Sequence, residues 1–104
     1  MSSLDDREKG FERKFAADEE AEFRAQSRGA RLLAEWAARR MGLENVEDYV
    51  HAVVRAELAG GEEDVVRKVG QDLVAAGLHM RESEVRTKAD EFLAVAREQV
   101  KAGE

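Results

Sequence analysis

The sequence contains no cysteine and no proline, and each absence excludes something. Without cysteine the chain can form neither a disulfide nor a thiolate metal site, which fits a reducing compartment. Without proline, no residue forces a break in a helix. No apolar run reaches the roughly 18 residues needed to cross a bilayer, and the polar, acidic start of the chain does not resemble a targeting presequence. We therefore expect a soluble, cytoplasmic protein with no direct membrane insertion.

An excess of positive charge is also missing. The formal net charge is −6, and a chain with that balance repels the phosphates of nucleic acid unless it segregates a basic face. The short basic clusters, Arg39-Arg40 and Arg67-Lys68, are interleaved with acids, which is typical of a solvated helix face. We expect no nucleic-acid partner.

Residues for catalysis or metal binding are few. His51 and His79 are the only imidazoles, and neither has a second ligand at the spacing of a metal site. His51 follows Glu47 by four positions, so a surface ion pair explains it. The hydroxyl of Ser83 is better explained as a helix cap than as a nucleophile, because no nucleophile-elbow motif surrounds it. The sequence therefore predicts no enzyme, no metal and no cofactor.

What the chain does contain, from Gly29 onward, is helical periodicity interrupted by glycine. The glycines Gly42, Gly60-Gly61, Gly77 and Gly103 are expected to end four helices. The second and fourth helices have plausible N-caps in Asn45 and Ser83. The apolar positions predicted to be buried are Leu32, Leu33, Trp36, Ala37 and Met41; Val46, Tyr49, Val50, Val53, Val54 and Leu58; Val65, Val66, Val69 and Leu73; and Val85, Ala89, Phe92, Leu93, Ala96 and Val100. This pattern predicts an all-α protein, a small four-helix bundle.

The first 24 residues differ from the rest. From Asp5 to Arg24, 13 of 20 residues are charged, so this segment cannot bury a core of its own. It nevertheless holds three of the four phenylalanines, and Leu4, Phe11 and Phe15 form a narrow stripe on a helix, at spacings of seven and four. We divide the chain into an arm (residues 1–24), expected to be mobile in a free monomer, and a body (residues 25–104). The stripe fits insertion into a partner's groove and packing onto the body equally well.

Several short motifs make the sequence resemble a known protein family. The arm carries DDRE from Asp5 and FExKFA from Phe11; the body carries LLxxWAA from Leu32, DVxRKVxxDL from Asp64 and SExxxRxK from Ser83. In order and spacing these segments are similar to the zeta subunit family of alphaproteobacteria, small inhibitors of the F-type ATP synthase. Two departures are Gly29, where the family favours a polar helix former, and residues 58–61, which replace a more acidic and aromatic stretch.

That resemblance implies a function and a site. It implies that residues up to about Glu19 enter the catalytic interface between the alpha and beta subunits of the F1 sector, near the gamma rotor, and block ATP hydrolysis. Phe11 and Phe15, with Leu4, would be the apolar anchors. The polar contacts implied in the same way are Asp5, Asp6, Arg7, Glu8, Glu12 and Lys14. The protein would then be peripheral to the inner membrane, through the ATP synthase.

A second hypothesis is a free-standing bundle that binds a nucleotide or another small ligand. The chain has no P-loop, so phosphates would rest on a helix N-terminus near Arg81, Arg86 and Lys88. Pairing of these bases with Glu82, Glu84 and Asp90 on a solvated face is the more economical explanation, because Glu84 to Lys88 is an i,i+4 pair, and so is Arg86 to Asp90.

Overall fold

The computed structural model describes the backbone of residues 2–104 and the side chains of residues 18–104. Over residues 2–104 it contains three helices and no strand: α1 (Ser2–Met41), α2 (Val46–Ala75) and α3 (Glu82–Lys101). The all-α prediction is confirmed, and the prediction of four helices is wrong. α1 also begins far earlier than the repeat from Leu32 indicated, because no proline or glycine cap interrupts it.

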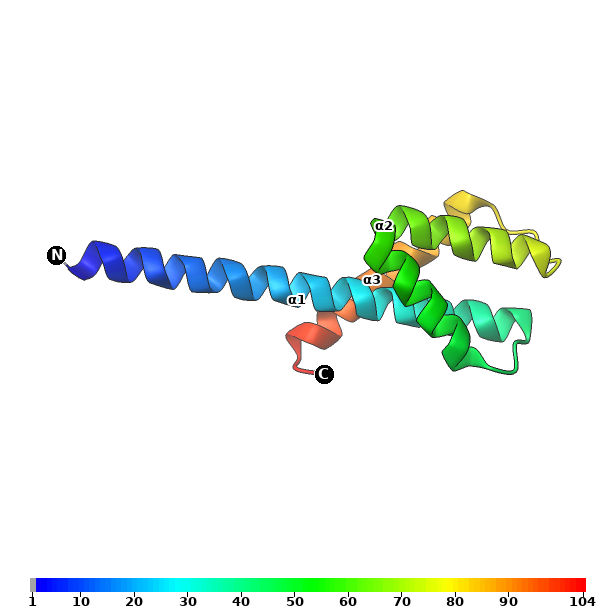
Figure 1. The fold of residues 1–104 in the computed structure, drawn as a ribbon, viewed down its shortest axis with the longest axis horizontal. Coiled ribbons are helices and arrows are strands. Elements are labelled where there is room, and N and C mark those ends of the chain that lie inside the picture. Colours follow the sequence, from blue (N-terminus) through cyan, green and yellow to red (C-terminus); the bar gives the residue numbers. More distant parts are fainter. Residues whose placement is uncertain (1) are drawn as a thin grey trace.

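The difference in helix number arises at Gly61. Its backbone angles are φ 73° and ψ −160°, outside the helical region, yet the helix resumes at the next residue. The two middle helices of the sequence prediction are therefore the halves of one bent helix, α2. Figure 1 shows the halves meeting at an angle, with no loop between them. A glycine accepts this conformation because it has no Cβ to clash.

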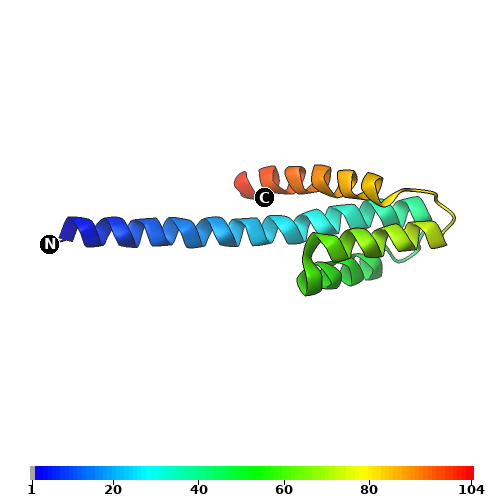
Figure 2. The same cartoon turned by 90° about the horizontal axis from the view of Figure 1, so that it is seen from above.

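α1 is the central element of the body, with α2 and α3 both packed against it (Figure 2). Its contribution to the core consists mainly of alanines, which let neighbouring helices approach closely, whereas α2 contributes branched valines. The core residues are Ala30, Leu33, Ala34 and Ala37 from α1; Val50, Val53, Val65, Val66, Val69 and Leu73 from α2; and Val85 and Ala89 from α3. Among residues 18–104 no polar or charged side chain is buried, so apolar packing holds the body together.

The helix ends mostly follow the sequence prediction. Gly42 has a φ of 70° directly after α1, and Asn45 Oδ1 accepts a hydrogen bond from the backbone N–H of Asp48 at 3.1 Å. Ser83 is not the N-cap of α3, since the helix begins at Glu82. The carboxylate of Glu84 instead accepts from the N–H of Arg81, at 3.3 Å.

Two apolar residues that the pattern predicted to be buried are more exposed than expected. Leu58 was expected in the core but is 58% exposed, because at about 100° per residue it lies about 140° round the helix from the buried Val53. Trp36 is only partly buried; it packs against the core and against Phe92, with 6.5 Å between ring centroids.

Candidate functional site

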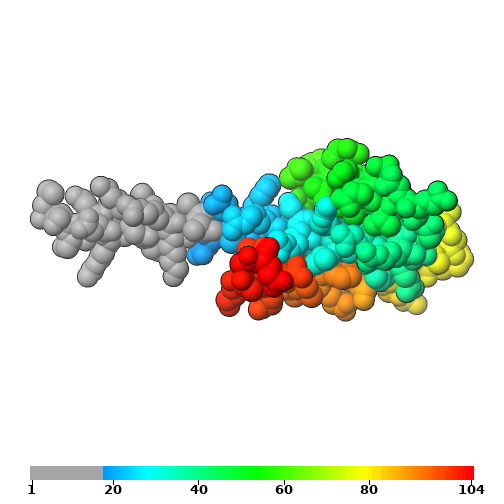
Figure 3. Space-filling view, turned by 90° about the horizontal axis from the view of Figure 1, so that it is seen from below, coloured from blue at the N-terminus to red at the C-terminus, as the bar shows by residue number. Residues whose placement is uncertain are grey.

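α1 extends beyond α2 and α3 at its N-terminal side (Figures 1 and 2). Among the side chains described, burial on α1 starts at Ala25, which is 1% exposed, whereas Phe23 is 55% exposed. A single helix thus leads from the packed body to the N-terminal segment. In the space-filling view of Figure 3, the C-terminal end of α3 lies against α1 just where the body ends.

Polar contacts tie α3 to α1 at this point. The guanidinium of Arg97 donates to both carboxylate oxygens of Glu22, with Nη2 at 2.6 Å from Oε1 and Nε at 3.2 Å from Oε2. The same hydrogen bonds lower the pKa of Glu22 below its ordinary value. Arg28 also donates to the backbone oxygen of Glu104. These contacts brace α1 on the side from which the N-terminal segment emerges.

The predicted partner-binding residues all lie on α1. Their side chains belong to residues 1–17 and lie outside the described ones, so their contacts stay a prediction. The helical backbone nevertheless fixes their angular positions. At about 100° per residue, positions 4, 11 and 15 fall within an arc of about 40°. At about 1.5 Å per residue, positions 15 and 11 lie about 15 and 21 Å along the axis from Ala25.

The bases of the nucleotide hypothesis are each held by a different carboxylate. Arg86 bonds to Glu63, with Nη2 at 3.3 Å from Oε2, which lowers the pKa of Glu63. Arg81 Nε lies 3.9 Å from Oε1 of Glu84, and Lys88 Nζ lies 3.3 Å from Oε2 of Glu91. The predicted pairs of Glu84 with Lys88 and of Arg86 with Asp90 are not the ones formed. Each of the three bases is thus engaged by an acid, as expected for a solvated helix face.

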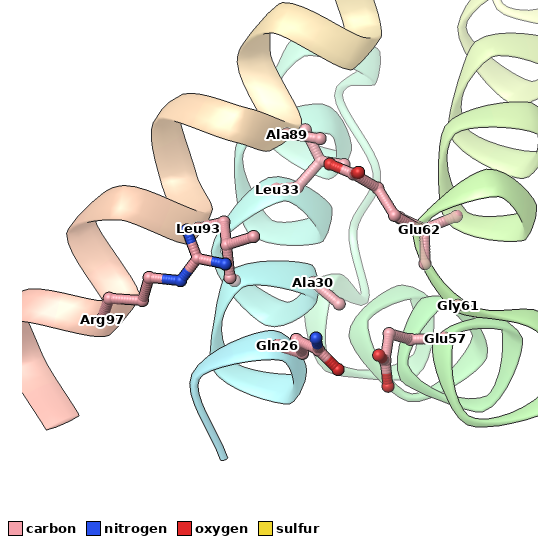
Figure 4. A pocket seen from close by; sticks show the side chains of 11 residues that line it. Gln26, Ala30, Leu33, Glu57, Gly61, Glu62, Ala89, Leu93 and Arg97 are labelled. Atoms are coloured by element: carbon pink, nitrogen blue, oxygen red, sulfur yellow. The ribbon is translucent and has the colours of Figure 1, made fainter. Parts of the chain in front are cut away.

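A cavity of about 300 Å³ lies beneath the kink of α2, between the three helices (Figure 4). Its lining includes the carboxyls of Glu57 and Glu62 and the side chain of Leu93. Burial raises the pKa of Glu57. A hydrogen bond with Asp90, and then burial, raises the pKa of Glu62. Sequence reasoning missed this cavity, because its walls come from segments far apart in the chain.

Both histidines lie on the surface of the body. His51 is exposed, with Nε2 at 3.6 Å from Oε1 of Glu47 as the spacing indicated. His79 is exposed in the link between α2 and α3. Among the described residues, no three potential ligands are gathered in a way that could hold a metal ion. No helix in the part of the chain searched is long and apolar enough to cross a membrane.

These features define a class: a small helical protein that presents one end of its central helix beyond its core. Comparison with protein families matches residues 1–99 to the ATPase inhibitor subunit zeta, and the chain belongs to this family. Comparisons with curated proteins and with solved structures gave no match. The family consists of regulatory subunits and not of catalytic ones, so the chain is a regulator of an ATPase and associates with ATP synthase.

Proposed function

We propose that the protein inhibits ATP hydrolysis by inserting its arm, residues 1–24, into the F1 sector of ATP synthase. The arm would enter the catalytic interface between the alpha and beta subunits near the gamma rotor. The body, residues 25–104, would stay outside and hold the arm in place. The observation that carries the proposal is that α1 is one helix from Ser2 to Met41.

This continuity makes the body a support for the arm. The C-terminal half of α1 is buried between two helices through Leu33, Ala34 and Ala37, and Arg97 holds it at Glu22. A helix anchored in this way presents its other end in a defined direction. An arm that is already helical would lose less conformational entropy on entering its partner than the mobile arm expected from the sequence.

The stripe of Leu4, Phe11 and Phe15 supports insertion over packing onto the body. All three positions precede Ala25, the first buried residue among the described side chains of α1, by ten residues or more. A narrow apolar stripe on a helix suits a groove in a partner. We propose Phe11 and Phe15 as anchors, because buried aromatic side chains commonly dominate interface energies.

The charged residues of the arm have a different proposed role. Rim charges mainly set the association rate and the orientation of a complex. We assign this role to Asp5, Asp6, Arg7, Glu8, Glu12 and Lys14. The free protein would be a cytoplasmic monomer that reaches the inner membrane only through the ATP synthase.

The proposal is tested by removing the two proposed anchors. Phe11→Ala combined with Phe15→Ala should abolish inhibition of ATP hydrolysis by purified F1, because each anchoring ring is expected to contribute about 2 kcal/mol or more. The thermal melt should not change, because the core that the structure describes is formed by residues 30–89. The double variant and the parent are titrated into a steady-state hydrolysis assay.

Phe23→Ala provides the matched control. It removes a ring from the same helix, but Phe23 lies about 80° round the helix from Phe15 and next to the body. This variant should inhibit within about twofold of the parent, as expected for a residue outside the interface centre. Full inhibition by the Phe11 and Phe15 double variant would show that the stripe is not the inhibitory surface.

A further inference from the structure

A second surface of α1 has the chemistry of a binding site. We define the Trp36 face as Trp36, Arg39, Arg40, Lys88 and Phe92. A shallow groove of about 360 Å³ runs across it, lined by Leu32 and by all of these residues except Lys88. The face lies near the C-terminal end of α1, at the opposite end of this helix from the arm (Figure 1).

The floor of the groove is aromatic and its edge is cationic. The rings of Trp36 and Phe92 are tilted by 55° relative to each other. The guanidinium carbon of Arg40 lies 5.5 Å from the centroid of the Trp36 ring. Lys88 Nζ lies 5.6 Å from the same centroid and 5.7 Å from that of Phe92. Such cation–π contacts hold the cations beside the rings.

The two arginines of this face are not paired with acids among the described residues. Lys88 is paired with Glu91, and the nearby Glu35 lies within 4.0 Å of Arg31. Arg39 and Arg40 are exposed and form no ion pair within residues 18–104. They therefore form a cationic spot on a chain whose formal net charge is −6.

The helix dipole alone does not account for the Trp36 face. Basic residues in the last turn stabilise the negative end of a helix, which explains the two arginines. It does not explain why the only tryptophan and Phe92 stay partly exposed beside them around a groove. Partly exposed aromatic rings next to arginine are typical of the energetic centres of protein interfaces.

We propose that the Trp36 face docks an acidic segment of the F1 sector. Carboxylates of that segment would pair with Arg39 and Arg40, and one of its apolar side chains would occupy the groove between Trp36 and Phe92. The inference rests on the proposed function only in taking the same ATPase as the partner. Charge complementarity selects an acidic segment.

Two contacts at opposite ends of α1 would reinforce each other. Arg39 lies about 36 Å along the helix axis from position 15, so the Trp36 face meets a part of the partner distant from the arm. Once one contact forms, the other becomes intramolecular and gains a high effective concentration. The Trp36 face should therefore change the affinity for F1, while the arm determines whether hydrolysis stops.

The test measures binding of the full chain to immobilised, purified F1 by interferometry, with hydrolysis assayed in parallel. Arg39→Glu with Arg40→Glu should raise the Kd about tenfold, mainly by slowing association, and should weaken the salt dependence. Inhibition should still become complete at saturating concentration. Arg55→Glu with Lys101→Glu makes the same charge change at exposed positions outside the groove and should shift the Kd by no more than about twofold.

Arg39→Gln with Arg40→Gln guards against misfolding caused by acids at a helix C-terminus. It should melt like the parent and raise the Kd about threefold, because attraction is lost without new repulsion. An unchanged Kd for this variant overturns the proposal, as does an equal effect of the reversal pair and its control. If the parent binds F1 without inhibiting it, the arm mechanism fails while the Kd comparison still decides the Trp36 face. If the parent does not bind F1, both proposals fail.

Discussion

One side chain at the kink of α2, that of Glu62, destabilises the folded protein when it is ionised. Glu62 faces Asp90 of α3, and the hydrogen bond between these carboxyls requires a proton, which raises the pKa of Glu62 above its ordinary value of 4.5. The folded protein thus binds this proton more tightly than the unfolded chain does. The ionised carboxyl therefore weakens folding at pH values above its folded pKa, and this effect is absent below pH 4.5.

Glu62→Gln should stabilise the protein at pH 7. The amide can donate a hydrogen bond to Asp90 without a proton, and the gain should be about 0.5 kcal/mol, because water screens charges this exposed. Thermal melts at pH 7 and pH 4 check it: the gain should vanish at the lower pH. Glu98→Gln removes the same charge at an exposed position. If Glu98→Gln gives the same gain, net charge and not the Asp90 contact is responsible.

At the scale of the helix, Gly61 determines the path of α2. Its φ of 73° and ψ of −160° lie in a region that is essentially restricted to glycine. Gly70 is different, because it lies in regular helix and a Cβ there would meet nothing within 4 Å. The same substitution should therefore have opposite effects at the two positions.

Gly61→Ala should destabilise the protein by about 1–3 kcal/mol, the cost of a strained non-glycine backbone. Gly70→Ala should stabilise it by about 0.5–1 kcal/mol, because alanine favours helix and restricts the unfolded chain. Urea unfolding followed by circular dichroism measures both. Stabilisation by Gly61→Ala would show that the kink is not held at this glycine.

The same residue explains how far the sequence could predict the fold. At Gly42 and Gly77 a positive φ follows the last helical turn, and the glycine pattern located both ends. At Gly61 φ is also positive, but the chain re-enters helix at once, and the sequence pattern does not distinguish these two outcomes. The helical spacing of positions 4, 11 and 15 could be predicted because it is local. The cavity near Glu57 and the groove beside Trp36 could not, because residues distant in sequence build them.

The whole molecule is 66 Å long and only 23 by 21 Å across, because α1 is much longer than the body is wide. Its described core residues lie between Ala25 and Ala96. Stability and the proposed inhibition are therefore expected to reside in different parts of the chain.

Deleting residues 1–17 should separate these two properties. The truncated protein should keep its melting temperature within a few degrees, which corresponds to less than about 1 kcal/mol for a domain of this size. It should fail to inhibit F1 at any concentration that stops hydrolysis with the full chain. Calorimetry and the hydrolysis assay measure the two effects. Inhibition by the truncated protein would place the active surface on the body.

The sharing of one helix by arm and body also restricts how the chain can change. Inserting one residue between Asp18 and Arg24 would turn the arm about 100° relative to the body and shift it about 1.5 Å. A substitution at an exposed position in this stretch changes neither the angle nor the distance. Under the proposed mechanism, the number of residues in this stretch is therefore constrained independently of their identity, because it sets both the distance and the rotation between body and arm.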